Sequence, residues 1–194
     1  VIKAMLEAGG SGAAYEFDLV NLTRQWLSNN FEIRFQEYKT AYEAGDAAGA
    51  GAIAAELLST FDTLETLLRS QSYFLVGKWI ADARSWGADA AEADYFESNA
   101  RNLLTTWGDR GNLLTDYADR TWAGLVSTYY KARWDLFFTD AAAALAAGEA
   151  FDQAAFDEKC KDLEYAWWKE RPGTFTAVPE GDSKKIVESI ICQR

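Results

Sequence analysis

A group of aromatic and polar side chains surrounds a glycine-containing turn near the middle of the chain. Trp107 is followed by Gly108, and Asn112, Asp116 and Tyr117 come shortly after it. Flat aromatic faces beside a few directed polar groups are typical of small-ligand pockets with an apolar wall. The competing interpretation is that Trp107 packs against the end of a helix, and its spacing alone favours that interpretation.

Carboxylates near this turn raise the question of catalysis, because glycoside hydrolysis uses two carboxylates that flank the scissile bond. Asp116 and Asp119 are one helical turn apart, but acidic residues near helix starts also stabilise the helix dipole without any catalytic role. The sequence contains no histidine, which excludes Ser–His–Asp and Cys–His catalysis and all imidazole metal sites. We therefore predict no catalytic residue, no metal and no cofactor in this chain.

Arg133 lies in a stretch that is apolar on nearly every helical face. A buried arginine should be paired with a carboxylate. Asp94, Asp116 or a carboxylate of a neighbouring domain are the alternatives, and the sequence leaves the choice open. Cys160 and Cys192 form either one disulfide or two free thiols, of which free thiols are the simpler interpretation.

The elements that position these residues are predicted to be helices, because apolar residues recur at spacings of three and four along nearly the whole chain. Two prolines among 194 residues permit long helices. We predict an all-α bundle of about seven mostly antiparallel helices in one domain, residues 1–194. The predicted helices run from a glycine-rich break at 9–12 to about 43, then over 47–69, 72–86, 89–107, 116–147, 152–171 and 183–192, with Ser72, Asp89, Asp116 and Asp152 as N-caps.

Composition restricts the partners. Thirty acidic and 19 basic side chains give a net charge of −11, which disfavours nucleic acid and anionic membranes as partners. No apolar run approaches the roughly 20 residues of a membrane span. The first residues, 1–6, already have a helical pattern, so we expect the chain to be part of a longer polypeptide.

Ordered motifs along the chain match a known family. They are YEFDLVNLTRQ (15–25), FLVGKW (74–79), EADYFESNAR (92–101), LTTWG (104–108), GNLL (111–114), DYA (116–118), WAGL (122–125) and YYKARW (129–134). On these motifs the chain resembles, over nearly its whole length, the C-terminal helical domain of glycoside hydrolase family 89, the α-N-acetylglucosaminidases.

The resemblance implies a larger retaining enzyme that removes terminal α-linked N-acetylglucosamine with two glutamates on a (β/α)-barrel. The helical domain would pack on that barrel and form one wall of the sugar pocket, so that the partners are the barrel of the same polypeptide and a glycan ending in α-linked N-acetylglucosamine. Such an enzyme would be exported, to the periplasm or the outside of a bacterium or to the lysosome of a eukaryote.

Carried onto this chain, the resemblance places Trp107 and Tyr117 against the sugar, with Asn112 either bracing the loop or contacting the ligand. Arg101, Asp116 and Arg133 would support the loop or a domain interface. The competing function is a non-catalytic helical binding or interaction module, whose aromatic surface serves another partner. Full burial of Trp107 and Tyr117 within the domain would contradict the pocket-wall role.

Overall fold

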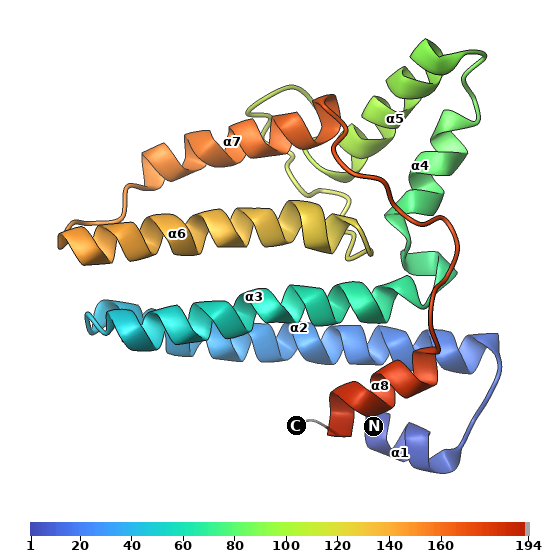
Figure 1. The fold of residues 1–194 in the computed structure, drawn as a ribbon, viewed down its shortest axis with the longest axis horizontal. Helices are drawn as coiled ribbons and strands as arrows, with labels where there is room; N and C mark the ends of the chain where they lie inside the picture. The colour runs from blue at the N-terminus through green and yellow to red at the C-terminus, as the bar shows by residue number, and fades with distance from the viewer. Residues whose placement is uncertain (193–194) are drawn as a thin grey trace. The chain divides into compact units, whose positions relative to one another are not determined.

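The computed structural model describes residues 1–192, which are all-α with no strand among them (Figure 1). The all-α prediction is therefore confirmed. The described part has one α-helix more than the seven predicted, because the residues before the glycine-rich break form a helix of their own. The helices are α1 (Ile2–Ala8), α2 (Ala13–Glu43), α3 (Ala47–Arg69), α4 (Val76–Arg84), α5 (Ala90–Leu104), α6 (Lys131–Ala147), α7 (Gln153–Lys169) and α8 (Ser183–Cys192), with a 3-10 turn at Ser72–Phe74 and a π-helical turn at Val126–Tyr130.

One compact unit contains the chain up to Phe74 and the segment from Pro179 onward. Helices α2 and α3 run side by side in opposite directions (Figure 1). Asp46 caps α3 by accepting a hydrogen bond from the backbone N–H of Gly49 at 2.9 Å. The most deeply buried side chains of this unit are aliphatic, Leu19, Leu27, Leu57, Leu67, Leu68 and Val187, and the aromatic rings of Tyr38, Phe61 and Phe74 are also buried.

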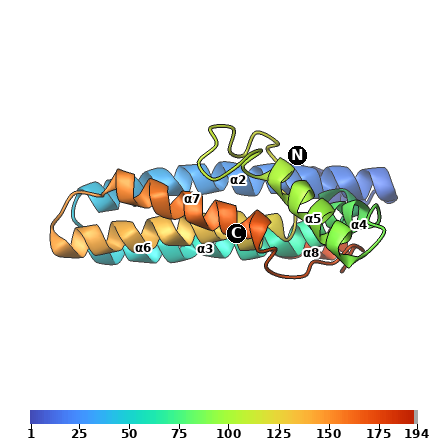
Figure 2. The ribbon, with the colours of Figure 1, turned by 90° about the horizontal axis from the view of Figure 1, so that it is seen from above.

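The second compact unit spans Leu75–Val178 and contains the residues that the sequence singled out. Helices α6 and α7 lie side by side within it (Figures 1 and 2), and α4 packs on α5. The two N-caps predicted here hold: Asp89 accepts a hydrogen bond from Glu92 N at 3.0 Å, and Asp152 accepts one from Ala155 N at 3.0 Å. Its core contains Val76, Ile80, Leu104, Leu125, Tyr129 and Trp167.

The predicted helix over 116–147 is wrong in its first part, and Asp116 is not its N-cap. Residues 105–124 are non-helical, and regular α6 follows only after the π-helical turn. Asp116 has a φ of +61° and Gly124 a φ of +85°, and neither value is compatible with a right-handed helix. The apolar residues of this stretch do not form one buried helical face: Leu113, Leu114 and Tyr117 are exposed, and Ala123, at its end, is buried.

The third and fourth predicted helices are shorter than the sequence indicated. The third predicted helix is divided, because the Val76 N–H donates to the carbonyl of Ala123 at 3.1 Å and Leu75 is extended. Ser72 therefore begins a short 3-10 turn instead of capping α4. The fourth ends at Leu104, three residues before Trp107. None of the helices in residues 1–192 combines the length and apolarity needed to cross a bilayer.

Candidate functional site

The loop after α5, residues 105–119, holds three non-glycine residues in the left-handed region of backbone space. Their φ values are +45° for Trp107, +61° for Asp116 and +47° for Asp119. Such a conformation costs roughly 1–3 kcal/mol per residue and persists only where surrounding contacts hold it. Strained residues of this kind cluster at ligand sites, so the loop is the first place to look for one.

Side-chain amides hold the first half of the loop in place. Asn112 donates from Nδ2 to the carbonyls of Thr106 at 3.0 Å and Trp107 at 2.7 Å. Asn102 donates to the carbonyl of Gly108 at 2.6 Å. A Cβ at Gly108 would lie 2.2 Å from Asn112 Nδ2, so the close approach of the two residues requires glycine. Asn112 thus braces the loop, and a direct ligand contact by its side chain stays a prediction.

Two aromatic rings of the loop lie together at the surface. The centroids of Trp107 and Tyr117 are 4.8 Å apart, with 34° between the ring planes. Trp107 is 43% exposed and Tyr117 is 67% exposed. The packing interpretation of Trp107 therefore accounts for only part of its surface. The fold of this chain leaves both rings open to a partner or ligand.

Arg133 links α6 to the loop and to α7. Its two terminal nitrogens each meet a carboxylate at 2.5 Å: one contacts Asp116 Oδ2 and the other contacts Glu164 Oε1. The guanidinium also lies over the ring of Tyr129, 4.9 Å from its centroid. Burial raises the pKa of the Glu164 carboxyl, and the hydrogen bond from Arg133 opposes that rise.

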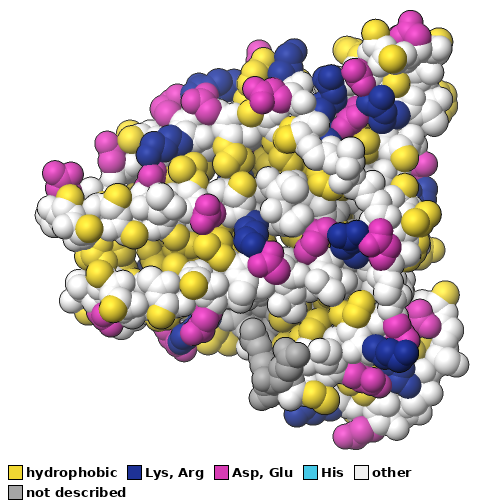
Figure 3. Space-filling model, viewed as in Figure 1, with side chains coloured by type: hydrophobic (Ala, Val, Ile, Leu, Met, Phe, Trp, Pro, Cys, Tyr) yellow, Lys and Arg dark blue, Asp and Glu magenta, His cyan; other side chains and the backbone are white. Residues whose placement is uncertain are grey.

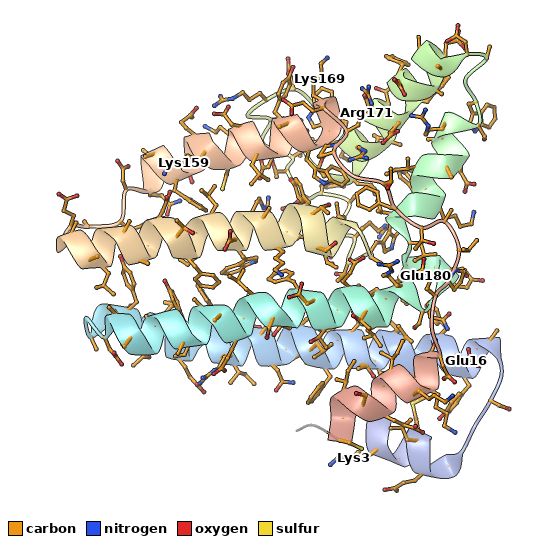
Figure 4. The ribbon with its side chains drawn as sticks, viewed as in Figure 1. Lys3, Glu16, Lys159, Lys169, Arg171 and Glu180 are labelled. Atoms are coloured by element: carbon orange, nitrogen blue, oxygen red, sulfur yellow. The ribbon has the colours of Figure 1, made fainter. Side chains whose placement is uncertain are left out.

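Of the three alternatives for Arg133, the structure brings Asp116 to it and not Asp94. Asp94 instead contacts Arg84 at 2.7 Å and Arg171 at 3.3 Å; Figure 4 shows Arg171 just beyond the end of α7. The sequence analysis missed Glu164. The available signal was an acidic residue on the apolar side of α7, which is costly unless it is paired.

Arg101 belongs to a different network. It is 1% exposed, and its guanidinium contacts Glu97 at 2.7 Å, donates to the carbonyl of Pro172 at 3.0 Å and lies 4.7 Å from the Trp167 ring centroid. These contacts tie α5 to the C-terminal end of α7 and the segment after it. Arg101 supports the unit that carries the loop without reaching the exposed rings.

A hollow with a charged lining lies in another part of the second unit. It has a volume of about 540 Å³ and lies between α4, α5 and the segment after α7; its charged lining consists of Arg84, Asp94, Glu97, Arg101, Glu170 and Arg171. On the face drawn in Figure 3, basic side chains lie beside acidic ones. In residues 1–192, no group of three or more acidic or cysteine side chains is placed to hold a metal ion. Cys160 and Cys192 are both free thiols.

Known proteins resemble this chain in sequence and in structure. Residues 2–193 match the family described as "Alpha-N-acetylglucosaminidase (NAGLU) C-terminal domain". The human protein "Alpha-N-acetylglucosaminidase" is 36% identical over 181 residues, which cover 91% of this chain and 24% of the human protein.

The solved structures that resemble this chain include two of a family 89 glycoside hydrolase from Clostridium perfringens. The first is a family 89 glycoside hydrolase in complex with 2-acetamido-1,2-dideoxynojirmycin, with a TM-score of 0.87, 26% identity, and coverage of 99% of this chain and 23% of that one. The second is a double variant of the family 89 enzyme in complex with its substrate GlcNAc-α-1,4-galactose, with a TM-score of 0.82, 28% identity, and coverage of 93% and 21%. The chain spans about a quarter of the length of these relatives, and it belongs to the family of α-N-acetylglucosaminidase C-terminal domains.

Proposed function

We propose that this chain, residues 1–194, is the C-terminal domain of an exported retaining α-N-acetylglucosaminidase, and that its loop 105–119 forms one wall of the pocket for terminal α-linked N-acetylglucosamine. The observation that carries the proposal is the half-exposed pair of Trp107 and Tyr117 on a strained and internally braced loop. The Clostridium perfringens relatives, described with an acetamido sugar analogue and with a substrate that ends in N-acetylglucosamine, support the choice of ligand.

Each loop residue then has a separate task. Trp107 presents an indole face to an apolar face of the sugar ring. Tyr117 offers a phenolic hydroxyl for hydrogen bonding to the sugar. Asn112 keeps the backbone carbonyls of Thr106 and Trp107 in place, so the indole is held before the ligand arrives.

The bond-breaking step lies outside this chain. A retaining glycosidase needs an acid/base and a nucleophile about 5–5.5 Å apart. Asp116, the carboxylate nearest the rings in sequence, is already engaged with Arg133. The resemblance to family 89 assigns the two catalytic carboxylates to a barrel of the same polypeptide, on which the domain packs, and the domain by itself is expected to be inactive.

The test uses the full polypeptide that carries this chain, with an aryl α-N-acetylglucosaminide as substrate. Trp107→Ala and Tyr117→Phe are expected to raise KM. For Trp107→Ala the expected rise is on the order of tenfold or more, because a tryptophan that a bound ligand covers can act as a hot spot worth about 2 kcal/mol, and about 1.4 kcal/mol already corresponds to a factor of ten. Trp86→Ala is the matched control, because Trp86 is 80% exposed just after α4 and is not in the loop. Unchanged KM and kcat in both loop variants would contradict the proposal and favour a non-catalytic binding module.

A further inference from the structure

We infer that Glu164 is a positioning residue for the sugar-pocket wall: through Arg133 it fixes the carboxylate of Asp116 and thereby the loop that carries Trp107 and Tyr117. The inference rests on the proposed function for its effect on substrate. Its structural part, the coupling of α7 to the loop, can be measured separately.

One terminal nitrogen of Arg133 contacts Glu164 on helix α7, and the other contacts Asp116 in the loop. Glu164 sits on α7 with a side chain that is only 9% exposed, whereas the side chain of Asp116 in the loop is 28% exposed. A guanidinium is planar, so a carboxylate bound to one arm fixes the direction of the other arm. The buried Glu164 carboxylate therefore determines where Arg133 presents its second arm to Asp116.

Two tyrosine rings restrict the position of the Arg133 guanidinium but do not determine its orientation. The π-helical turn directly before α6 brings Tyr129 and Tyr130 near the guanidinium, with their centroids 4.9 and 5.5 Å away. Turns of this type add a residue to the helix and often occur at functional positions. Aromatic faces attract a cation but do not form directed hydrogen bonds with it, so the orientation of Arg133 within this cage depends on Glu164.

Asp116 depends on this contact more than an ordinary loop residue would. Its φ of +61° is strained, and its N–H donates to the carbonyl of Thr105 at 2.7 Å. One carboxylate oxygen binds Arg133, while the other is buried without a hydrogen-bond partner in the described part of the chain. Tyr117 is the next residue, and its ring contacts Trp107. A shift of Asp116 therefore moves the exposed aromatic pair.

A purely structural role for Glu164 would be to join α6 and α7. Another ion pair already does this without touching the loop: Lys159 on α7 contacts Asp140 on α6 at 2.8 Å. Asp140→Asn is therefore a matched control for Glu164→Gln. Both substitutions remove one carboxylate charge between the same two helices. Only Glu164→Gln removes a partner of Arg133, the residue that contacts the loop, so only this variant is expected to change the loop.

The experiment compares these variants in the full polypeptide. For Glu164→Gln we expect KM for the aryl substrate to rise on the order of tenfold, with kcat changed much less, because misplaced binding groups weaken substrate positioning while the barrel carboxylates are intact. We also expect faster hydrogen exchange of loop peptides that contain the Asp116 amide. Asp140→Asn should change neither. In an Asp116→Asn background, Glu164→Gln should add little, because the two residues act through one arginine.

The possible results separate the inference from the proposed function. Wild-type KM and loop exchange in Glu164→Gln would overturn the inference, as would fully multiplicative effects with Asp116→Asn. If Glu164→Gln does not fold, Glu164→Asp keeps the charge, shortens the reach to Arg133 and is expected to raise KM in the same way. If loop exchange responds to Glu164 but Trp107→Ala and Tyr117→Phe leave KM unchanged, the proposed function fails while the coupling is supported.

Discussion

Gly108→Ala tests whether the loop is held by the Asn112 amide. The backbone at Gly108 is not in the left-handed region, so alanine introduces no backbone strain there. Its Cβ would, however, lie 2.2 Å from Asn112 Nδ2 and 2.8 Å from its Cγ. The amide must move away, which breaks its hydrogen bonds to the carbonyls of Thr106 and Trp107.

Two hydrogen bonds of about 0.5–1.5 kcal/mol each give an expected loss of about 1–3 kcal/mol in the free energy of unfolding. The measurement is urea unfolding followed by circular dichroism and by tryptophan fluorescence, with limited proteolysis to report on the loop itself. Gly51→Ala is the control, because nothing lies within 4 Å of a Cβ at that position on α3. It should raise the free energy of unfolding by about 0.5–1 kcal/mol.

The decisive comparison is the double variant. Asn112→Ala removes the same two hydrogen bonds and also removes the obstacle to the Cβ at position 108. Gly108→Ala should therefore cost close to nothing in the Asn112→Ala background. Equal costs of Gly108→Ala in both backgrounds, or no cost in the wild-type chain, would refute the role assigned to the amide.

Further expectations concern the buried ion pair, the thiols and a helix cap. Arg101→Met should lower the free energy of unfolding by about 3 kcal/mol in a denaturant titration, because it removes the hydrogen bonds of the buried guanidinium to Glu97 and to the Pro172 carbonyl, each worth about 1.5–3 kcal/mol, while Arg84 still pairs with Glu97; a loss below 1 kcal/mol would contradict this. Burial raises the pKa of the Cys160 thiol to about 11, so at pH 7.5 the thiol is protonated, and alkylation of a Cys192→Ser variant should be slow and accelerate as the pH rises toward that value. Alkylation at a rate independent of pH would contradict the assignment. Asp89→Ala removes the N-cap of α5 and should lower thermal stability by about 1 kcal/mol, while an unchanged melting temperature would show that the cap contributes nothing.

The helices outside the loop were predictable because their signals are local. The capping aspartates Asp89 and Asp152 each hold the third residue after them, as the pattern of acceptor and following helix indicates. The long α2 and α3 follow from uninterrupted apolar periodicity on either side of Gly45. For these helices, the local sequence alone indicates where the helix begins, which side of it is buried and where it ends.

The loop was not predictable in the same way, because its conformation depends on residues distant in the sequence. Asp116 looks like a helix cap from its neighbours alone, yet its N–H bonds to Thr105 and its carboxylate to Arg133. Glu164 lies 31 residues from Arg133, and no local pattern connects the two. Tertiary contacts of this kind outweigh the helix propensity of the residues between 116 and 124.

The sequence by itself determined that the chain is all-α, that it has no histidine chemistry, and that its motifs match the C-terminal domain of a glycosidase family. Periodicity, composition and ordered motifs are properties of the sequence, so no coordinates were needed for these conclusions. Only the tertiary structure decided that Trp107 and Tyr117 lie together at the surface, that Asn112 braces their loop, and that Arg133 joins Asp116 to Glu164. Exposure and ion pairing depend on which distant side chains fill the space around a residue, and that is determined only when the helices pack.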